Sequence, residues 1–113
     1  DATRAWNTHD DVYRAVGAWL DARDVPADLP VMVVNPPAFY YFARRPALAI
    51  PNEPADVVAH VCRRFGAGYL LLERDRPAPL DAFFRDLQRE ATLRPVAEWS
   101  DPFSGAKLYR CLP

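Results

Sequence analysis

The sequence predicts a small three-layer α/β domain with a mixed sheet of about five strands, the first three parallel and the last two an antiparallel hairpin. Short apolar segments alternate with amphipathic segments of helix length along most of the chain, which is the order of α/β proteins. Right-handed crossovers between such strands make them parallel and place helices over the sheet. A chain of 113 residues is the size of one domain with one core, so we assign residues 1–113 to a single domain.

The first helix is predicted over residues 8–23. Thr8 followed three residues later by Asp11 is a variant of the capping box that marks helix starts, and apolar side chains then recur at helical spacing. After a loop with two prolines, residues 31–35 are apolar and rich in valine. The absence of polar alternation is typical of a strand covered on both faces.

Two prolines end this strand. Pro36 and Pro37 lack backbone donors, and Pro37 also disfavours a helical conformation at Pro36. We therefore expect a short helix over residues 38–45, preceded by Asn35 or Pro36, with Pro37 suited to its first position. Residues 47–50 then form the second short strand.

A second long helix is predicted to begin near Pro54 and to end before Gly66. Arg63 and Arg64 in its last turn suit the helix dipole, and Gly66 suits a left-handed cap. The apolar stripe of this helix is predicted to contain Val57, Val58, Val61, Cys62 and Phe65.

The rest of the chain predicts a strand, a helix and a hairpin. Residues 68–73 form the third strand and residues 79–88 the third helix, which begins at Pro79. The apolar side of this helix is predicted to contain Leu80, Phe83, Phe84 and Leu87. Residues 96–99 and 107–112 are separated by Asp-Pro and Ser-Gly turn residues, as in a hairpin.

Composition excludes several classes of protein. A net charge of -1 and a pI near 6.1 argue against binding to nucleic acid, which needs clustered excess cations. The longest apolar runs are far shorter than the roughly 20 residues that cross a bilayer, so we expect the chain by itself to be soluble. It begins at Asp1 without a methionine or a signal-like segment, which predicts that it is a piece of a longer protein.

The two cysteines leave two interpretations open. Cys62 and Cys111 lack the paired spacing of a zinc site. Bridged, they would close a loop of about fifty residues and stabilise the fold by roughly 4 kcal/mol. Unbridged, they would be two small buried hydrophobic residues, since free cysteine is among the most buried types. We favour the second interpretation.

Polar residues follow each of the three predicted parallel strands. These are Asn35, Asn52 and Glu73, and ligands of open α/β sheets bind outside the carboxyl ends of the strands. The connection between the first two strands adds four further candidates that could lie over the same edge: Tyr40, Tyr41, Arg44 and Arg45. An aromatic face with such hydrogen-bonding groups suits a sugar or another polar metabolite.

A structural interpretation of the same residues competes with this site, and we favour it. Asparagine is preferred at caps and turns, Glu73 belongs to a charged cluster, and the aromatic residues can pack a short helix. His9 is next to Asp10 and Asp11, but these look like the start of a helix, and His60 is alone on the second long helix. No nucleophile elbow or glycine-rich phosphate loop is present. We assign no catalytic residue, no metal and no cofactor.

Three segments of the chain resemble a known family. The run AWLDARDVPADLPVMVVNPPAFYYFARRPALAIPN, the run RRFGAGYLLLE and the terminal KLYRCLP resemble the soluble tail of polytopic membrane glycosyltransferases of the GT-C type. Those enzymes are similar to protein mannosyltransferases that use dolichyl-phosphate-mannose and to bacterial aminoarabinose transferases. The resemblance implies an extracytoplasmic domain, C-terminal to membrane helices that use a polyprenyl-phosphate sugar donor. It carries over no catalytic residue, because in such enzymes these lie in early loops between membrane helices.

Three functional hypotheses follow. The leading one is a non-catalytic extracytoplasmic accessory domain, whose partners are the membrane helices of the parent chain and a sugar or glycan acceptor. The second is a freestanding domain that binds a small polar ligand at Asn35, Asn52 and Glu73. The third is a protein-interaction module that uses the aromatic residues 39–42, several of which then have to be exposed as one apolar patch.

Overall fold

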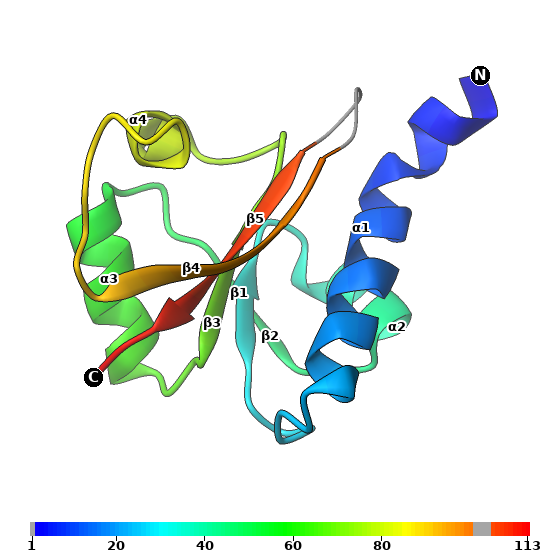
Figure 1. The fold of residues 1–113 in the computed structure, drawn as a ribbon, viewed down its shortest axis with the longest axis horizontal. Coiled ribbons are helices and arrows are strands. Elements are labelled where there is room, and N and C mark those ends of the chain that lie inside the picture. The colour runs from blue at the N-terminus through cyan, green and yellow to red at the C-terminus, as the bar shows by residue number, and fades with distance from the viewer. Residues whose placement is uncertain (1, 101–104) are drawn as a thin grey trace.

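The computed structural model describes residues 2–100 and 105–113, with side chains from residue 10 onward. The elements, in chain order, are α1 (Ala2–Ala22), β1 (Val31–Val33), α2 (Pro36–Ala43), β2 (Ala47–Ala49), α3 (Ala55–Arg64), β3 (Tyr69–Leu72), the 3-10 turn η1 (Ala78–Leu80), α4 (Asp81–Phe84), β4 (Leu93–Trp99) and β5 (Ala106–Cys111). They form three layers, with α1 and α2 on one face of the sheet and α3 and α4 on the other (Figure 1).

The sheet has five strands in the order β2-β1-β3-β5-β4. β1 pairs in parallel with β2 and β3, and β5 pairs antiparallel with β3 and β4. The predicted α/β class, the parallel first three strands and the antiparallel C-terminal pair are therefore confirmed. The Asp-Pro and Ser-Gly turn predicted for the hairpin falls mainly on residues 101–104, which lie outside the described part of the chain.

The central strands alternate between two apolar cores because successive side chains of a strand point to opposite faces. Met32, Leu70 and Leu72 pack against α3 and α4, whereas Val31, Val33 and Leu71 pack against α1 and α2. These strands are buried on both faces, which explains why their sequences lack polar alternation.

The first two helices begin earlier than predicted. α1 starts at Ala2, so Thr8 lies inside the helix and the predicted capping box is wrong. Alanine and arginine among residues 2–7 are good helix formers and let the helix extend toward the N-terminus. α2 starts at Pro36, so both prolines occupy its first positions, and the Asn35 side chain accepts a hydrogen bond from the Ala38 N–H at 3.3 Å.

The second long helix buries a different stripe from the predicted one. Val58 and Cys62 are buried as expected, but Val57 and Phe65 are exposed. Ala55 and Ala59 take their places in the core at helical spacing from Val58 and Cys62. A search for large apolar residues overlooks these alanines because their side chains are small. The cap at Gly66, which has φ +71, is as predicted.

The third helix is shorter than predicted. It ends at Phe84, and Asp86 adopts the left-handed conformation with φ 61. The N–H of Leu87 then donates to the carbonyl of Ala82 at 2.8 Å, a bond typical of a Schellman helix end. Leu87 is consequently exposed and is not part of the core.

Candidate functional site

The polar residues at the carboxyl ends of the parallel strands differ in exposure. Asn35 and Asn52 are exposed on the turns after β1 and β2. Glu73 directly follows β3, at the centre of the sheet, and is only 3% exposed. Glu73 is therefore not part of a solvated charge cluster, which corrects the structural interpretation of that residue.

Tyr13 of α1 connects two of these positions. Its ring is fully buried against Phe39, with ring centroids 5.2 Å apart, and its hydroxyl oxygen accepts a hydrogen bond from the Asn35 N–H at 3.2 Å. Burial, followed by the charge of Glu73 and a hydrogen bond to it, raises the pKa of Tyr13 far above its ordinary value. The phenol therefore stays protonated and donates to the Glu73 carboxylate. The sequence reasoning missed Tyr13, although a tyrosine on a core-facing helix position signals a need for a polar partner.

Helix α2 separates the remaining candidates from this cluster. Its N-cap, Asn35, lies beside the end of β1, and its C-cap, Arg44, comes shortly before β2, whose first residue pairs with the first residue of β1. Arg44 thus lies near the amino edge of the sheet, opposite Asn35. Tyr40 and Tyr41 lie along the helix, 65% and 66% exposed. The structure brings together Asn35 and Glu73, and it places Arg44 away from them.

Arg45, adjacent to Arg44, holds the loop after α1. It is 3% exposed, and its guanidinium forms an ion pair of 2.7 Å with Asp21. It also donates to the carbonyls of Pro26 and Val25, at 2.9 and 3.1 Å. This arginine has a structural role, because all of these bonds fix the connection between α1 and β1.

Two cavities lie elsewhere, beside the edge strand β4. One of about 510 Å³ and one of about 390 Å³ share the lining residues Asp86, Pro95 and Tyr109. Neither cavity is lined by Asn35, Asn52 or Glu73. These two cavities therefore do not support the hypothesis of a small-ligand site at those three residues. Tyr109 also escaped the sequence reasoning, because its strand position resembles ordinary core.

The described residues contain no cluster of three or more metal-ligating side chains. His60 is exposed on α3, and the side chain of His9 lies outside the described part of the chain. The Tyr13, Asn35 and Glu73 cluster contains a carboxylate and a protonated phenol but no serine, threonine or cysteine nucleophile. Ligand binding by Asn35, Tyr40, Tyr41, Arg44, Asn52 and Glu73 stays a prediction.

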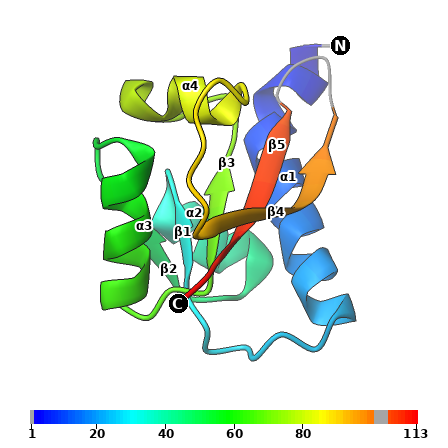
Figure 2. The same cartoon turned by 60° about the vertical axis from the view of Figure 1, so that its left-hand side comes forward.

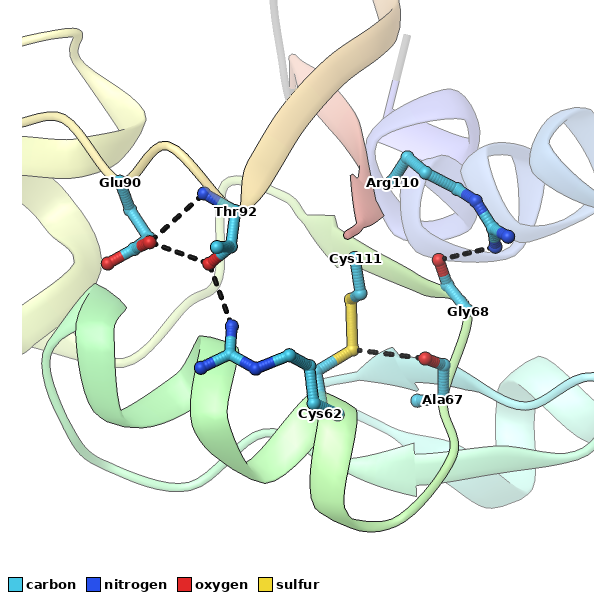
Figure 3. The surroundings of a disulfide bond; sticks show 8 residues. Cys62, Ala67, Gly68, Glu90, Thr92, Arg110 and Cys111 are labelled. Atoms are coloured by element: carbon cyan, nitrogen blue, oxygen red, sulfur yellow. Dashed lines mark hydrogen bonds between the residues drawn. A yellow bond between two sulfur atoms is a disulfide. The ribbon is translucent and has the colours of Figure 1, made fainter. Parts of the chain in front are cut away.

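Cys62 and Cys111 form a disulfide that connects α3 to β5, which corrects the preference for two free thiols (Figure 3). Their Cα atoms are 6.5 Å apart across 49 residues of sequence. Cys62 belongs to α3, which packs on one face of the sheet. Cys111, at the end of β5, points its side chain to the same face, so the two cysteines meet. An even cysteine count, together with an expected extracytoplasmic location, was the available signal for this bond.

A hydrogen-bonded chain lies beside the disulfide (Figure 3). Arg63 of α3 donates to the Thr92 hydroxyl at 2.9 Å, and Thr92 donates from its hydroxyl and its backbone N–H to the Glu90 carboxylate. These bonds, with a smaller contribution from the charge of Arg63, lower the pKa of Glu90. The chain anchors the segment that leads into β4.

Comparisons with family models, curated proteins and solved structures found no match to this chain. Within the described residues, none of the helices is both long enough and apolar enough to traverse a lipid bilayer.

Proposed function

We propose that this chain is a non-catalytic accessory domain on the extracytoplasmic side of a membrane glycosyltransferase that uses a polyprenyl-phosphate sugar donor. The observation that carries the proposal is the disulfide between Cys62 and Cys111. Disulfides form and persist in oxidising compartments and are rare in the cytosol. An extracytoplasmic location is also what the resemblance of the three sequence segments implies.

The use of polar groups at the carboxyl edge of the sheet supports a non-catalytic role. Asn35 caps α2 with its side chain and binds Tyr13 with its backbone, while Glu73 accepts from the Tyr13 hydroxyl. These groups therefore hold α1, α2 and β3 together. In the proposed assembly, the chemistry belongs to the membrane helices, and this domain positions the acceptor or stabilises the membrane part.

The location is tested on the parent protein in its own cells. Free thiols are first blocked in intact cells, then the protein is denatured, reduced and labelled with a maleimide of large mass. We expect the parent protein to be found in the membrane fraction. Its band on the gel should shift only when the protein has been reduced before labelling, because the disulfide protects the two cysteines from the first blocking step. The C62S/C111S variant is the matched control and loses this part of the shift. Thiols blocked before reduction, or a parent protein in the cytosolic fraction, would refute the proposal.

The accessory role is tested by deleting the domain from the parent enzyme. We expect the membrane part to retain hydrolysis of the polyprenyl-phosphate sugar, in which water takes the sugar and the polyprenyl phosphate leaves, while transfer to the natural acceptor falls. Complete loss of donor cleavage from a correctly inserted protein would contradict a non-catalytic role. A parent gene without upstream membrane helices would remove the glycosyltransferase assignment.

A protein-interaction module is the second candidate, favoured by the exposure of Tyr40 and Tyr41. Their rings are among the few large apolar groups exposed on the described part of the chain. The Cζ atom of the Arg44 guanidinium lies 5.9 Å from the centroid of the Tyr41 ring. Tyrosine and arginine are enriched among the interface residues whose replacement by alanine costs the most binding free energy. A photo-crosslinking residue in place of Tyr41 should capture a partner in cells, whereas one in place of Glu53, on the turn before α3, should not. Equal capture from both positions would argue against this candidate.

A further inference from the structure

The two cavities beside β4 form one groove, which we call the β4 groove. It lies between β4 and the segment 83–91, which runs from α4 to the start of β4 over the α3 side of the sheet (Figures 1 and 2). Its two parts measure about 510 and 390 Å³. Small-molecule sites in proteins span roughly 300–1,000 Å³, so each part is large enough for a compact ligand.

The wall shared by the two parts carries a buried hydroxyl without a partner. Tyr109 is 3% exposed, and its hydroxyl makes no hydrogen bond with any described residue. Burial, followed by the charges of Asp86 and Glu98, raises the pKa of Tyr109, so the group is a donor. A buried hydroxyl without a hydrogen-bond partner destabilises the fold, and a ligand that accepts a hydrogen bond from it would remove that cost.

The larger part of the β4 groove is also lined by charged side chains of both signs. Its two carboxylates already accept hydrogen bonds, Glu90 from Thr92 and Asp86 from Lys107 at 3.3 Å. Arg89 and Arg94 line the same part and are exposed, and neither side chain has a hydrogen bond or ion pair with the described residues. Gln88, the other polar residue of the lining, is an exposed neutral amide that can both donate and accept. The free charge of this part is therefore positive, above an apolar floor that includes Phe83 and Leu93.

We infer that the β4 groove binds a small organic anion, a phosphate ester or a carboxylate carried on a compact apolar body. Arg89 and Arg94 hold the anionic group, since guanidinium groups pair with phosphate and carboxylate in bidentate geometry. The Tyr109 hydroxyl donates to an oxygen of the ligand, and the apolar body covers Phe83 and Leu93. The inference goes beyond the proposed function and does not depend on the compartment or on the parent chain.

The test is a titration of the isotopically labelled domain, followed by NMR of its backbone amides. The probes are phenyl phosphate, benzoate, inorganic phosphate and the neutral phenyl β-glucoside. We expect phenyl phosphate or benzoate to shift the amides of Arg89, Arg94 and Tyr109 in a saturable way. Inorganic phosphate should bind more weakly because it lacks the apolar body, and the glucoside should bind least. The order of the first two probes distinguishes a phosphate ester from a carboxylate.

Three variants identify the residues that bind. R89Q/R94Q should weaken the better anion by about tenfold or more, and Y109F by about threefold. Y109F should unfold at the same or a higher temperature, because it removes an unsatisfied buried group, so weaker binding cannot be attributed to misfolding. R64Q removes an exposed arginine from α3, outside the groove, and should bind like the wild type. No saturable shift with either anion, equal binding of the glucoside, or unchanged affinity in R89Q/R94Q would overturn the inference.

Discussion

Gly17 of α1 lies directly against Ala43 of α2. A Cβ atom at position 17 would be 3.0 Å from both the Cα and the Cβ of Ala43, and 3.2 Å from its carbonyl oxygen. Two of these three atoms belong to the backbone, so no side-chain rotation relieves the contact. The absence of a side chain at Gly17 therefore sets how closely α1 approaches α2, and with it the position of Tyr13 over the ends of the strands.

The first prediction concerns this contact. G17A should destabilise the fold by about 1–2 kcal/mol, because overpacking outweighs the gain of roughly 1 kcal/mol in helix propensity. Urea unfolding measures the change. A43G removes one of the opposing atoms, so the G17A/A43G double variant should lose less stability than the sum of the two single variants. Simple additivity, or a G17A variant more stable than the wild type, would show that the helices separate freely.

The second prediction concerns the disulfide. C62A/C111A should lose about 4 kcal/mol of unfolding free energy, since the bond closes a loop across 49 residues of sequence. Both cysteines are replaced because a single substitution leaves a reactive thiol in the core. Unfolding is measured with and without a phosphine reductant, which should destabilise the wild type and leave C62A/C111A unaffected. If the reductant does not shift the unfolding transition of the wild type, the stabilising role of the bond is contradicted.

The third prediction compares two exposed arginines in different backbone conformations. Arg44 has φ 60 and ψ 38, the left-handed region in which a non-glycine residue costs roughly 1 kcal/mol. R44G should therefore stabilise the protein by up to about 1 kcal/mol. The matched change R64G falls in the last turn of α3 and should destabilise by about as much. Thermal unfolding of the pair checks the signs, and a loss of stability in R44G would mean that its contact with Tyr41 outweighs the backbone strain.

Much of the fold was predictable because its main signals are local. The buried strand 69–72 is an unbroken apolar run, and the strand 31–33 is followed shortly by a pair of prolines, Pro36 and Pro37, that begin α2. Their parallel order follows from the handedness of the connections and needs no knowledge of side-chain contacts. Boundaries were predicted less well, as at Asp86, where a non-glycine residue takes the left-handed conformation and ends the helix early.

The candidate sites were less predictable because they depend on contacts between distant segments. Arg44 and Arg45 are adjacent and look alike in the sequence, yet only Arg45 is buried, because its partner Asp21 lies 24 residues earlier. The importance of Tyr109 likewise depends on the path of the segment after α4, which no local pattern specifies. The disulfide follows from the packing of α3 on β5, which the spacing of two cysteines does not reveal.

The last prediction uses the lowered pKa of Glu90. A carboxyl group whose pKa is lower in the folded state stabilises the protein above its unfolded pKa, about 4.3, and the stabilisation disappears as the pH falls through the folded value. The difference in free energy of unfolding between the wild type and E90Q should therefore be largest near pH 7. This difference should shrink as the pH is lowered from about 4.3 toward 2. Other titrating groups are common to both proteins and largely cancel in the difference.

The hydrogen bonds from Thr92 are the main cause of this shift, so the same comparison in a T92V background is the control. T92V removes the hydroxyl that donates to Glu90 and keeps the size of the side chain. The pH dependence of the difference between Glu90 and E90Q should become smaller in that background. A difference that does not change with pH in the wild-type background, or one that T92V leaves intact, would show that the bonds from Thr92 do not hold Glu90 in its charged form.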